Sequence, residues 1–126
     1  MTSNHSRRIK FVGSSQKDIM AFPLKVKDVT AHALNLAAAG LKHADAKPLK
    51  GPKGAAVMEL VMRNSGDAYR VVYTTRYADA IYVIHAFKKK SSHGIGMPKP
   101  DQECIGLRLK ALNEDRQNQT AHRSAS

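Results

Sequence analysis

The chain has 126 residues, of which 42% are hydrophobic and 25% are charged; this fits one globular domain with a buried core and argues against two domains or a disordered chain. The 21 Lys and Arg residues outnumber the 10 Asp and Glu residues, and the formal net charge is +11. Such an excess points to a polyanionic partner, with nucleic acid first, an acidic protein second and an anionic membrane surface third.

The N-terminal half predicts one strand, two helices and a loop. Alternating apolar and basic residues over 8–13 are typical of a half-buried strand. A short helix is expected over 16–22, and Pro23 suits the first turn of a second helix that stops at Gly40. The two helices are expected to form a hairpin. The stretch 43–56 contains Pro, Gly and Lys without periodicity, which predicts a loop.

The C-terminal half predicts three strands and a helix. Strands are expected over 57–64, 68–76 and 80–89, and the short connections between them predict an antiparallel meander. Apolar residues at helical spacing follow. The domain is expected to span 1–112, and 113–126 to be a frayed or disordered tail because its last residues have nothing to bury.

The order strand, helix, helix, strand, strand, strand, helix predicts a small α+β domain. Helices are expected to pack on one face of an antiparallel sheet, while the other face stays partly open. Strand alternation then predicts where the charges point. Arg70 and Arg76 share one face of their strand, and Glu59 and Arg63 lie opposite the apolar face of theirs. We expect these arginines to converge into a basic surface that binds phosphates.

The last strand ends in Lys88, Lys89 and Lys90. These lysines can hold a polyanion, but Lys-rich strand ends also prevent edge-to-edge aggregation. His85 stands earlier in the same strand among apolar residues. Both a hydrogen-bonded core histidine and a catalytic one are consistent with that position.

Several other features of the sequence argue against a metal site, a membrane span and a reactive cysteine. No CxxC or HExxH motif occurs and the six histidines show no ligand spacing, so no metal or small-molecule cofactor is expected. No apolar run approaches the ~18 residues of a membrane span, and no secretion signal opens the chain, which predicts a cytoplasmic protein without membrane contact. Cys104 cannot form an internal disulfide, and its helical core spacing favours a buried side chain over a nucleophile.

Four segments carry a family resemblance: FVGSSQKDIMAFP, AKPLKGPKGAAVMELV, GDAYRVVYTTRYADAIYVIHAFKKKSSHGIGMPKPD and ECIGLRLK. Along them, from about Ile9 to about Lys110, the chain resembles the phage-derived, HigB-like branch of the RelE/ParE toxin superfamily. The blocks AYRVVY and HAFKKKS are the most specific. The resemblance implies a RelE-like fold, a toxin of a type II toxin–antitoxin module, and a helix-turn-helix antitoxin as partner.

Many RelE-like toxins are ribosome-dependent endoribonucleases. The resemblance therefore implies mRNA on the ribosome as substrate and inhibition of translation, through a metal-independent attack of a ribose 2′-hydroxyl on the adjacent phosphodiester. The superfamily also contains ParE-like gyrase poisons, which cut nothing. An inactive basic module that binds nucleic acid or antitoxin is the third alternative.

The implied chemistry needs a base, an acid and fixed positive charge. Arg63 and Arg70 are the expected phosphate clamp, since a guanidinium matches two phosphate oxygens at once. The base is left open between His85, which we favour, Glu59 and a lysine whose pKa is lowered by its neighbours. Some relatives use a terminal Tyr or His, and here only His122 lies near the end. The residues expected to hold RNA are Arg76, Lys88, Lys89 and Lys90.

Overall fold

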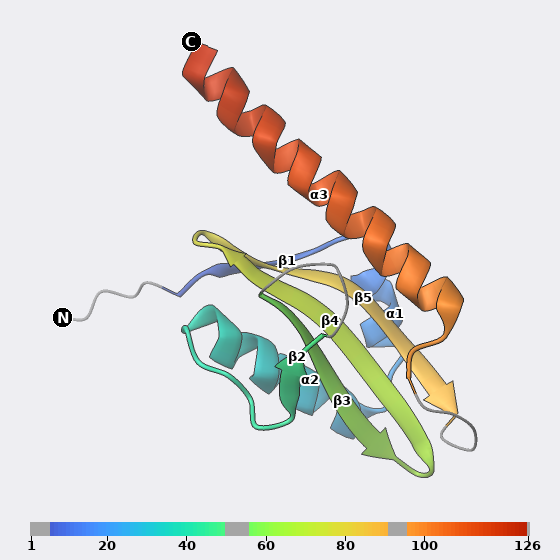
Figure 1. Cartoon of the computed structure of the whole chain (residues 1–126). Coiled ribbons are helices and arrows are strands. Elements are labelled where there is room, and N and C mark those ends of the chain that lie inside the picture. The colour runs from blue at the N-terminus through green and yellow to red at the C-terminus, as the bar shows by residue number, and fades with distance from the viewer. Residues whose placement is uncertain (1–5, 50–55, 91–95, 126) are drawn as a thin grey trace, which may run out of the picture.

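The computed structural model describes residues 6–49, 56–90 and 96–125, without the side chains of Lys90 and 120–125. Figure 1 shows an α+β domain, as predicted, whose one sheet has the strand order β1-β5-β4-β3-β2. In chain order the elements are β1 (Arg8–Phe11), α1 (Ser15–Met20), α2 (Leu24–Ala38), β2 (Ala46–Pro48), β3 (Val57–Asn64), β4 (Asp67–Tyr77), β5 (Ala80–Lys90) and α3 (Lys99–Ala125).

The sheet is mixed, whereas the sequence predicted an antiparallel one. Strands β3, β4 and β5 form the predicted antiparallel meander. Strand β1 instead runs parallel to β5, from the pair Arg8↔Ala80 to the pair Phe11↔Val83. Two helices separate β1 from the next strand, so no hairpin turn sets its direction and tertiary packing decides it.

The turn between β3 and β4 is determined by local chemistry. Ser65 and Gly66 both have positive φ, at 51° and 85°. Two such residues in a row give the tight turn whose twist matches a β-hairpin, and Gly adopts it without steric cost. The NSGD motif therefore fixes the register that continues along both strands.

A short strand replaces part of the predicted loop over 43–56. Strand β2 pairs antiparallel with β3, with Ala46 opposite Leu60. Three residues without apolar alternation give no strand signal in the sequence, so only the neighbouring strand creates this element. Residues 50–55 of the predicted loop lie outside the described residues.

The larger core lies between α2 and one face of the sheet. Phe22, just before α2, meets Tyr69 of β4 edge-on, with 5.0 Å between ring centroids. Burying each such side chain contributes roughly 1.5–3 kcal/mol. The other fully or nearly fully buried members of this core include Val26, Ala33, Leu34, Ala37, Leu60, Val71, Tyr73, Ile81 and Val83.

Helix α3 packs on the opposite face, which corrects the expectation that all helices share one face. Ile105 and Leu112 of α3 belong to a second core together with Val72, Tyr82 and Ile84. The physical reason is visible in β5: its stretch AIYVIHAF is apolar on both sides, as a strand covered on both faces requires. α3 covers only part of this face.

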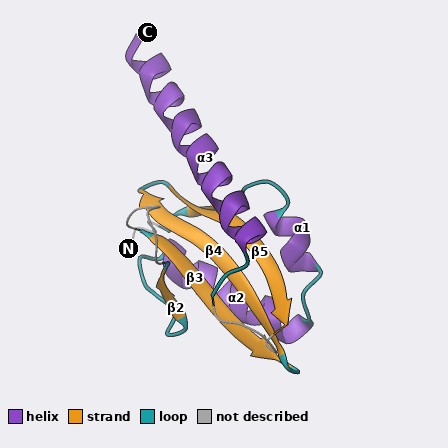
Figure 2. Ribbon diagram, turned by 45° about the vertical axis from the view of Figure 1, so that its right-hand side comes forward, coloured by secondary structure: helices purple, strands orange, loops and turns teal. Residues whose placement is uncertain are grey.

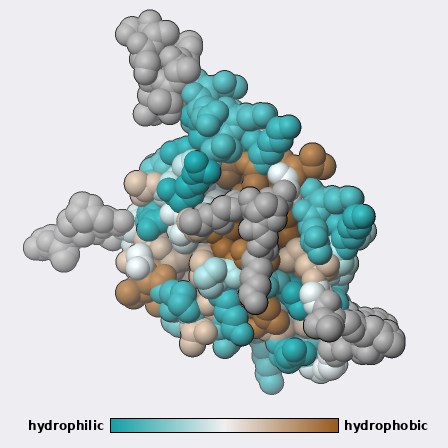
Figure 3. Space-filling view, in the orientation of Figure 1, coloured by the Kyte–Doolittle hydropathy of each residue, from teal (hydrophilic) through white to brown (hydrophobic). Residues whose placement is uncertain are grey.

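Helix α3 also continues where the sequence predicted a frayed tail over 113–126. It runs to Ala125, and Figures 1 and 2 show its C-terminal half projecting beyond the sheet. No Gly or Pro follows Gly106, so nothing in the sequence stops the helix. Figure 3 shows hydrophilic side chains along the described part of this projection and hydrophobic surface in the middle of the same face.

No helix among the described residues combines the length and the apolar character that crossing a membrane requires.

Arg116 fastens α3 to the hairpin between β4 and β5. Its guanidinium donates to both carboxylate oxygens of Asp79, at 3.0 and 2.8 Å, and to the hydroxyl of Tyr82 at 3.2 Å. It also lies 4.5 Å from the centroid of the Tyr77 ring. The hydrogen bond from Arg116 lowers the pKa of Asp79, and the same bond raises the pKa of Arg116.

We expect Arg116→Gln to lower the free energy of unfolding by about 1–2 kcal/mol at neutral pH, because it removes an exposed ion pair and a cation–π contact. The pKa of Asp79 is lower in the folded chain than its unfolded value of ~3.9. The stabilisation is therefore present above that pH and is lost as the pH falls through the folded pKa. Urea unfolding at neutral pH and near pH 3 measures both effects, and Lys25→Gln on α2 is the control. Equal stability of the two variants at neutral pH would contradict this role.

Candidate active site on the open face of the sheet

The register of β3, β4 and β5 aligns three rows of side chains on the face that α3 partly covers. Neighbouring rows are about 7 Å apart along the strands. Together they bring most of the predicted site residues onto one face; the sequence predicted this for the residues of β3 and β4, while the facing of β5 comes from the structure. The rows are Glu59, Val72, His85; then Val61, Arg70, Phe87; then Arg63, Ala68, Lys89.

Glu59 and Arg70 form an ion pair at the centre of these rows. Arg70 Nη1 donates to Glu59 Oε2 at 2.7 Å, and each side chain is 16% exposed. Arg70 Nε is buried and has no hydrogen-bond partner among the described residues. A buried unpaired N–H typically costs about 1–3 kcal/mol, so stability alone does not favour this arrangement.

His85 is held from two sides by α3. Its Nε2 lies 2.7 Å from Asp101 Oδ1, and its Nδ1 lies 3.3 Å from Arg108 Nη1. A guanidinium can only donate, so Nδ1 accepts and Nε2 carries the proton donated to Asp101. Cys104 Sγ is 3.7 Å from Nδ1, and the Phe87 ring stacks on the imidazole at 5.3 Å. His85 is thus a hydrogen-bonded, nearly buried histidine.

Arg108 is itself anchored by the start of the chain. Its guanidinium donates to the Ile84 carbonyl oxygen at 3.0 Å and to Ser14 Oγ at 3.2 Å. It packs so closely on Gly13 that a Cβ at that position would lie 2.6 Å from Arg108 Cζ. Gly13 also has a φ of +56°, which a side chain would strain.

Asp101 and Arg108 are not among the site residues that the sequence predicts. They follow His85 by 16 and 23 residues, on a different element. No spacing rule relates a strand residue to a helix residue across a loop. Only the docking of α3 on β5 reveals the contact.

The lysine block divides between the two faces of the sheet. Lys89 lies in the third row of the open face, and its Nζ donates to the Gly96 carbonyl oxygen. Lys88 is paired with Tyr69, whose ring lies in the α2 core, so Lys88 belongs to the other face and contacts Asp67 at 3.3 Å. The side chains of Lys90 and His122 lie outside the described residues. The three lysines therefore do not form one patch.

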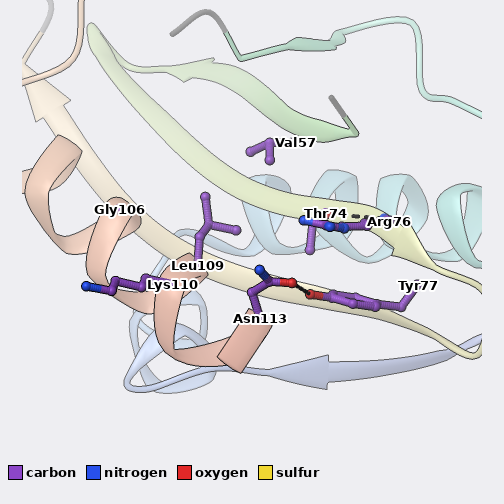
Figure 4. A pocket seen from close by; sticks show the side chains of 8 residues that line it. All are labelled: Val57, Thr74, Arg76, Tyr77, Gly106, Leu109, Lys110 and Asn113. Atoms are coloured by element: carbon purple, nitrogen blue, oxygen red, sulfur yellow. Dashed lines mark hydrogen bonds between the residues drawn. The ribbon is translucent and has the colours of Figure 1, made fainter. Parts of the chain in front are cut away.

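Arg76 stands at the other end of the open face. It is exposed, and its guanidinium lies 5.9 Å from the Tyr77 ring centroid. It lines a cleft of about 250 Å³ between β4 and α3 (Figure 4). Arg76 and Arg63 therefore lie at opposite ends of this face along the strands.

A comparison with curated proteins found no match. A family model, "Phage derived protein Gp49-like (DUF891)", matches residues 17–118, which include every site residue described above except those in the loop before α1. This family belongs to the group of phage-derived, HigB-like proteins associated with toxin–antitoxin toxins. The chain is therefore a member of the Gp49-like family of phage-derived, toxin-like proteins.

Proposed function

We propose that this protein is the toxin of a type II toxin–antitoxin module and acts as a ribosome-dependent mRNA endoribonuclease in the cytoplasm. One observation carries the proposal: Glu59 and His85 lie in one row of a sheet face, and Arg70 lies in the next row, on the strand between them. The family association and the net charge of +11 support it.

The placement of Glu59 and His85 suits an in-line attack on a phosphodiester. Such a reaction needs a base at the attacking 2′-oxygen and an acid at the leaving 5′-oxygen, on opposite sides of the phosphorus. Glu59 and His85 lie two strands apart, which is about 10 Å between their backbones. We assign the base to Glu59 and the acid to His85, in place of the base role that the sequence favoured for His85.

Arg70 is assigned to the phosphate. Glu59 takes one of the five N–H donors of its guanidinium, so others can donate to the non-bridging oxygens as negative charge builds up on them. The guanidinium is largely enclosed, and in a water-poor site its charge acts more strongly on the transition state. No metal ion enters this scheme.

The RNA strand is proposed to cross the open face from row to row. Arg63 and Lys89 occupy the third row and would hold one side of the strand, while Arg76 would hold the other. Lys88 and Lys90 are assigned to ribosomal RNA or to RNA beyond the sheet edge. An acidic segment of a helix-turn-helix antitoxin would compete for the same cations.

His85 needs a change at α3 before it can act. Both of its ring nitrogens have partners in this structure, namely Asp101 and Arg108. To give up a proton as the acid, the imidazole must first be protonated at both nitrogens, so Arg108 is proposed to leave Nδ1, which then takes up a proton. The leaving oxygen is proposed to replace Asp101 at Nε2 when RNA binds, because Asp101 lies in the first turn of α3, where α3 meets the open rows. Catalytic hydrogen bonds commonly form only in the complex.

The test is expression in a bacterial host followed by mapping of mRNA 5′ ends, comparing the wild type with Arg70→Lys. The wild type is expected to create new ends inside translated codons, and Arg70→Lys to reduce them about a hundredfold, because an ammonium keeps the charge but loses the planar fork. Lys25→Arg on α2 is the matched control. Growth arrest with intact mRNA and a DNA-damage response would instead indicate gyrase poisoning, and no effect at normal protein level would indicate a binding module.

A further inference from the structure

A cleft of about 250 Å³ adjoins the active-site rows, between β4 and α3. Thr74, Arg76 and Tyr77 line it from β4, and Lys110 and Asn113 line it from α3 (Figure 4). Gly106 contributes no side chain on the α3 side, which leaves the space open. We call this space the α3 cleft.

The polar atoms of the α3 cleft present donors. The Tyr77 hydroxyl donates to Asn113 Oδ1 at 3.2 Å, so the acceptor of that amide is used and its N–H groups remain. Figure 4 shows the Asn113 nitrogen on the side away from Tyr77. Thr74 Oγ1 accepts from the Arg76 backbone N–H at 3.2 Å, which leaves its hydroxyl proton to donate.

The charge at the cleft is positive. Arg76 and Lys110 both line it and are exposed, and none of the described residues that line it is Asp or Glu. Donors and cations together select an anion. Val57 and Leu109 add apolar surface to the lining, which suits an organic group more than a bare inorganic ion. The ligand that combines both features is a nucleotide unit.

The position of the α3 cleft relates it to the proposed reaction. Thr74 pairs with Val57 and Tyr82, and this row lies next to the row of Glu59 and His85. Adjacent rows are about 7 Å apart, a distance that one nucleotide of an extended strand can span. We propose that the α3 cleft binds the nucleotide next to the scissile phosphate, with Asn113 and Thr74 as donors and Arg76 and Lys110 at its phosphate. This inference rests on the proposed function.

Asn113→Asp is the sharpest test, because it keeps the shape and the acceptor for Tyr77 but replaces the amide donors with negative charge. The probe is a labelled single-stranded 2′-deoxy oligonucleotide, which cannot be cut by 2′-hydroxyl attack, and its affinity is measured by fluorescence anisotropy. We expect at least a tenfold loss of affinity. Asn35→Asp is the matched control, since it makes the same charge change at an exposed position on α2. Thermal unfolding confirms that both variants are folded.

The outcomes separate this inference from the proposed function. The proposed nucleotide site is overturned if Asn113→Asp and Asn35→Asp lower the affinity for the oligonucleotide equally, or if the wild type does not bind it. The site is also overturned if Asn113→Asp binds the oligonucleotide normally but no longer binds the antitoxin. The cleft would then be assigned to antitoxin binding. Cleavage of mRNA is measured separately: if the wild type cuts nothing while Asn113→Asp selectively weakens binding, the cleft stands and the nuclease proposal fails.

Discussion

Glu59→Gln is expected to slow mRNA cleavage by ~10²–10⁴-fold, the usual range for loss of a general base. The amide still has an oxygen that can accept from Arg70, so the contact at 2.7 Å can be kept while the proton acceptor is lost. The measurement is single-turnover cleavage of mRNA on programmed ribosomes, with thermal unfolding to check the fold.

Glu114→Gln provides the matched control for this change. It alters the net charge equally on an exposed part of α3, away from the rows. Any general gain in RNA affinity from removing one negative charge therefore appears in both variants. Wild-type cleavage by Glu59→Gln at normal stability would remove Glu59 from the mechanism and leave His85 as the candidate base.

His85→Gln is expected to slow cleavage by a similar ~10²–10⁴-fold, because the leaving 5′-oxygen would depart without a proton. The key comparison uses an mRNA with a bridging sulfur in place of that 5′-oxygen. A thiolate leaves without help, so the variant should cut this substrate nearly as fast as the wild type does. Rescue of this kind identifies an acid at the leaving group.

A purely structural role for His85 gives a different result. Loss of the contacts with Asp101 and Arg108 would loosen α3 and slow cleavage of both substrates alike. It would also lower the unfolding temperature. Equal loss on the oxygen and sulfur substrates, together with lower stability, would therefore assign His85 to the packing of α3 and not to catalysis.

Strand periodicity predicts which side chains of the candidate site share a face of their strand. Alternation predicts that Glu59 and Arg63 share one face of their strand and that Arg70 lies on one face of the next, because successive side chains of a strand point to opposite sides. That the two faces lie on the same side of the sheet follows from the register of β3 and β4. The same rule separates Lys88 from Lys89, and applying it strictly to the lysine block would have divided that block in advance. The grouping of the lysines was an inference from charge, which carries no direction.

The partners of His85 were not predictable. Asp101 and Arg108 reach it from α3 across the loop before that helix, and Arg108 in turn depends on Ser14 near the other end of the chain. Such contacts depend on which face of the sheet α3 covers. The apolar residues on both sides of β5 indicated a buried strand but did not say which element covers each side.

By itself, the sequence determined the α+β order, the antiparallel meander with its NSGD turn, and the face on which the arginines lie, because these follow from local periodicity and from turn chemistry. Only the tertiary structure decided that β1 runs parallel to β5, that α3 covers part of the open face, and that His85 is clamped between Asp101 and Arg108. Those features depend on contacts between residues far apart in the chain, and their free energy comes from surfaces that meet only after folding.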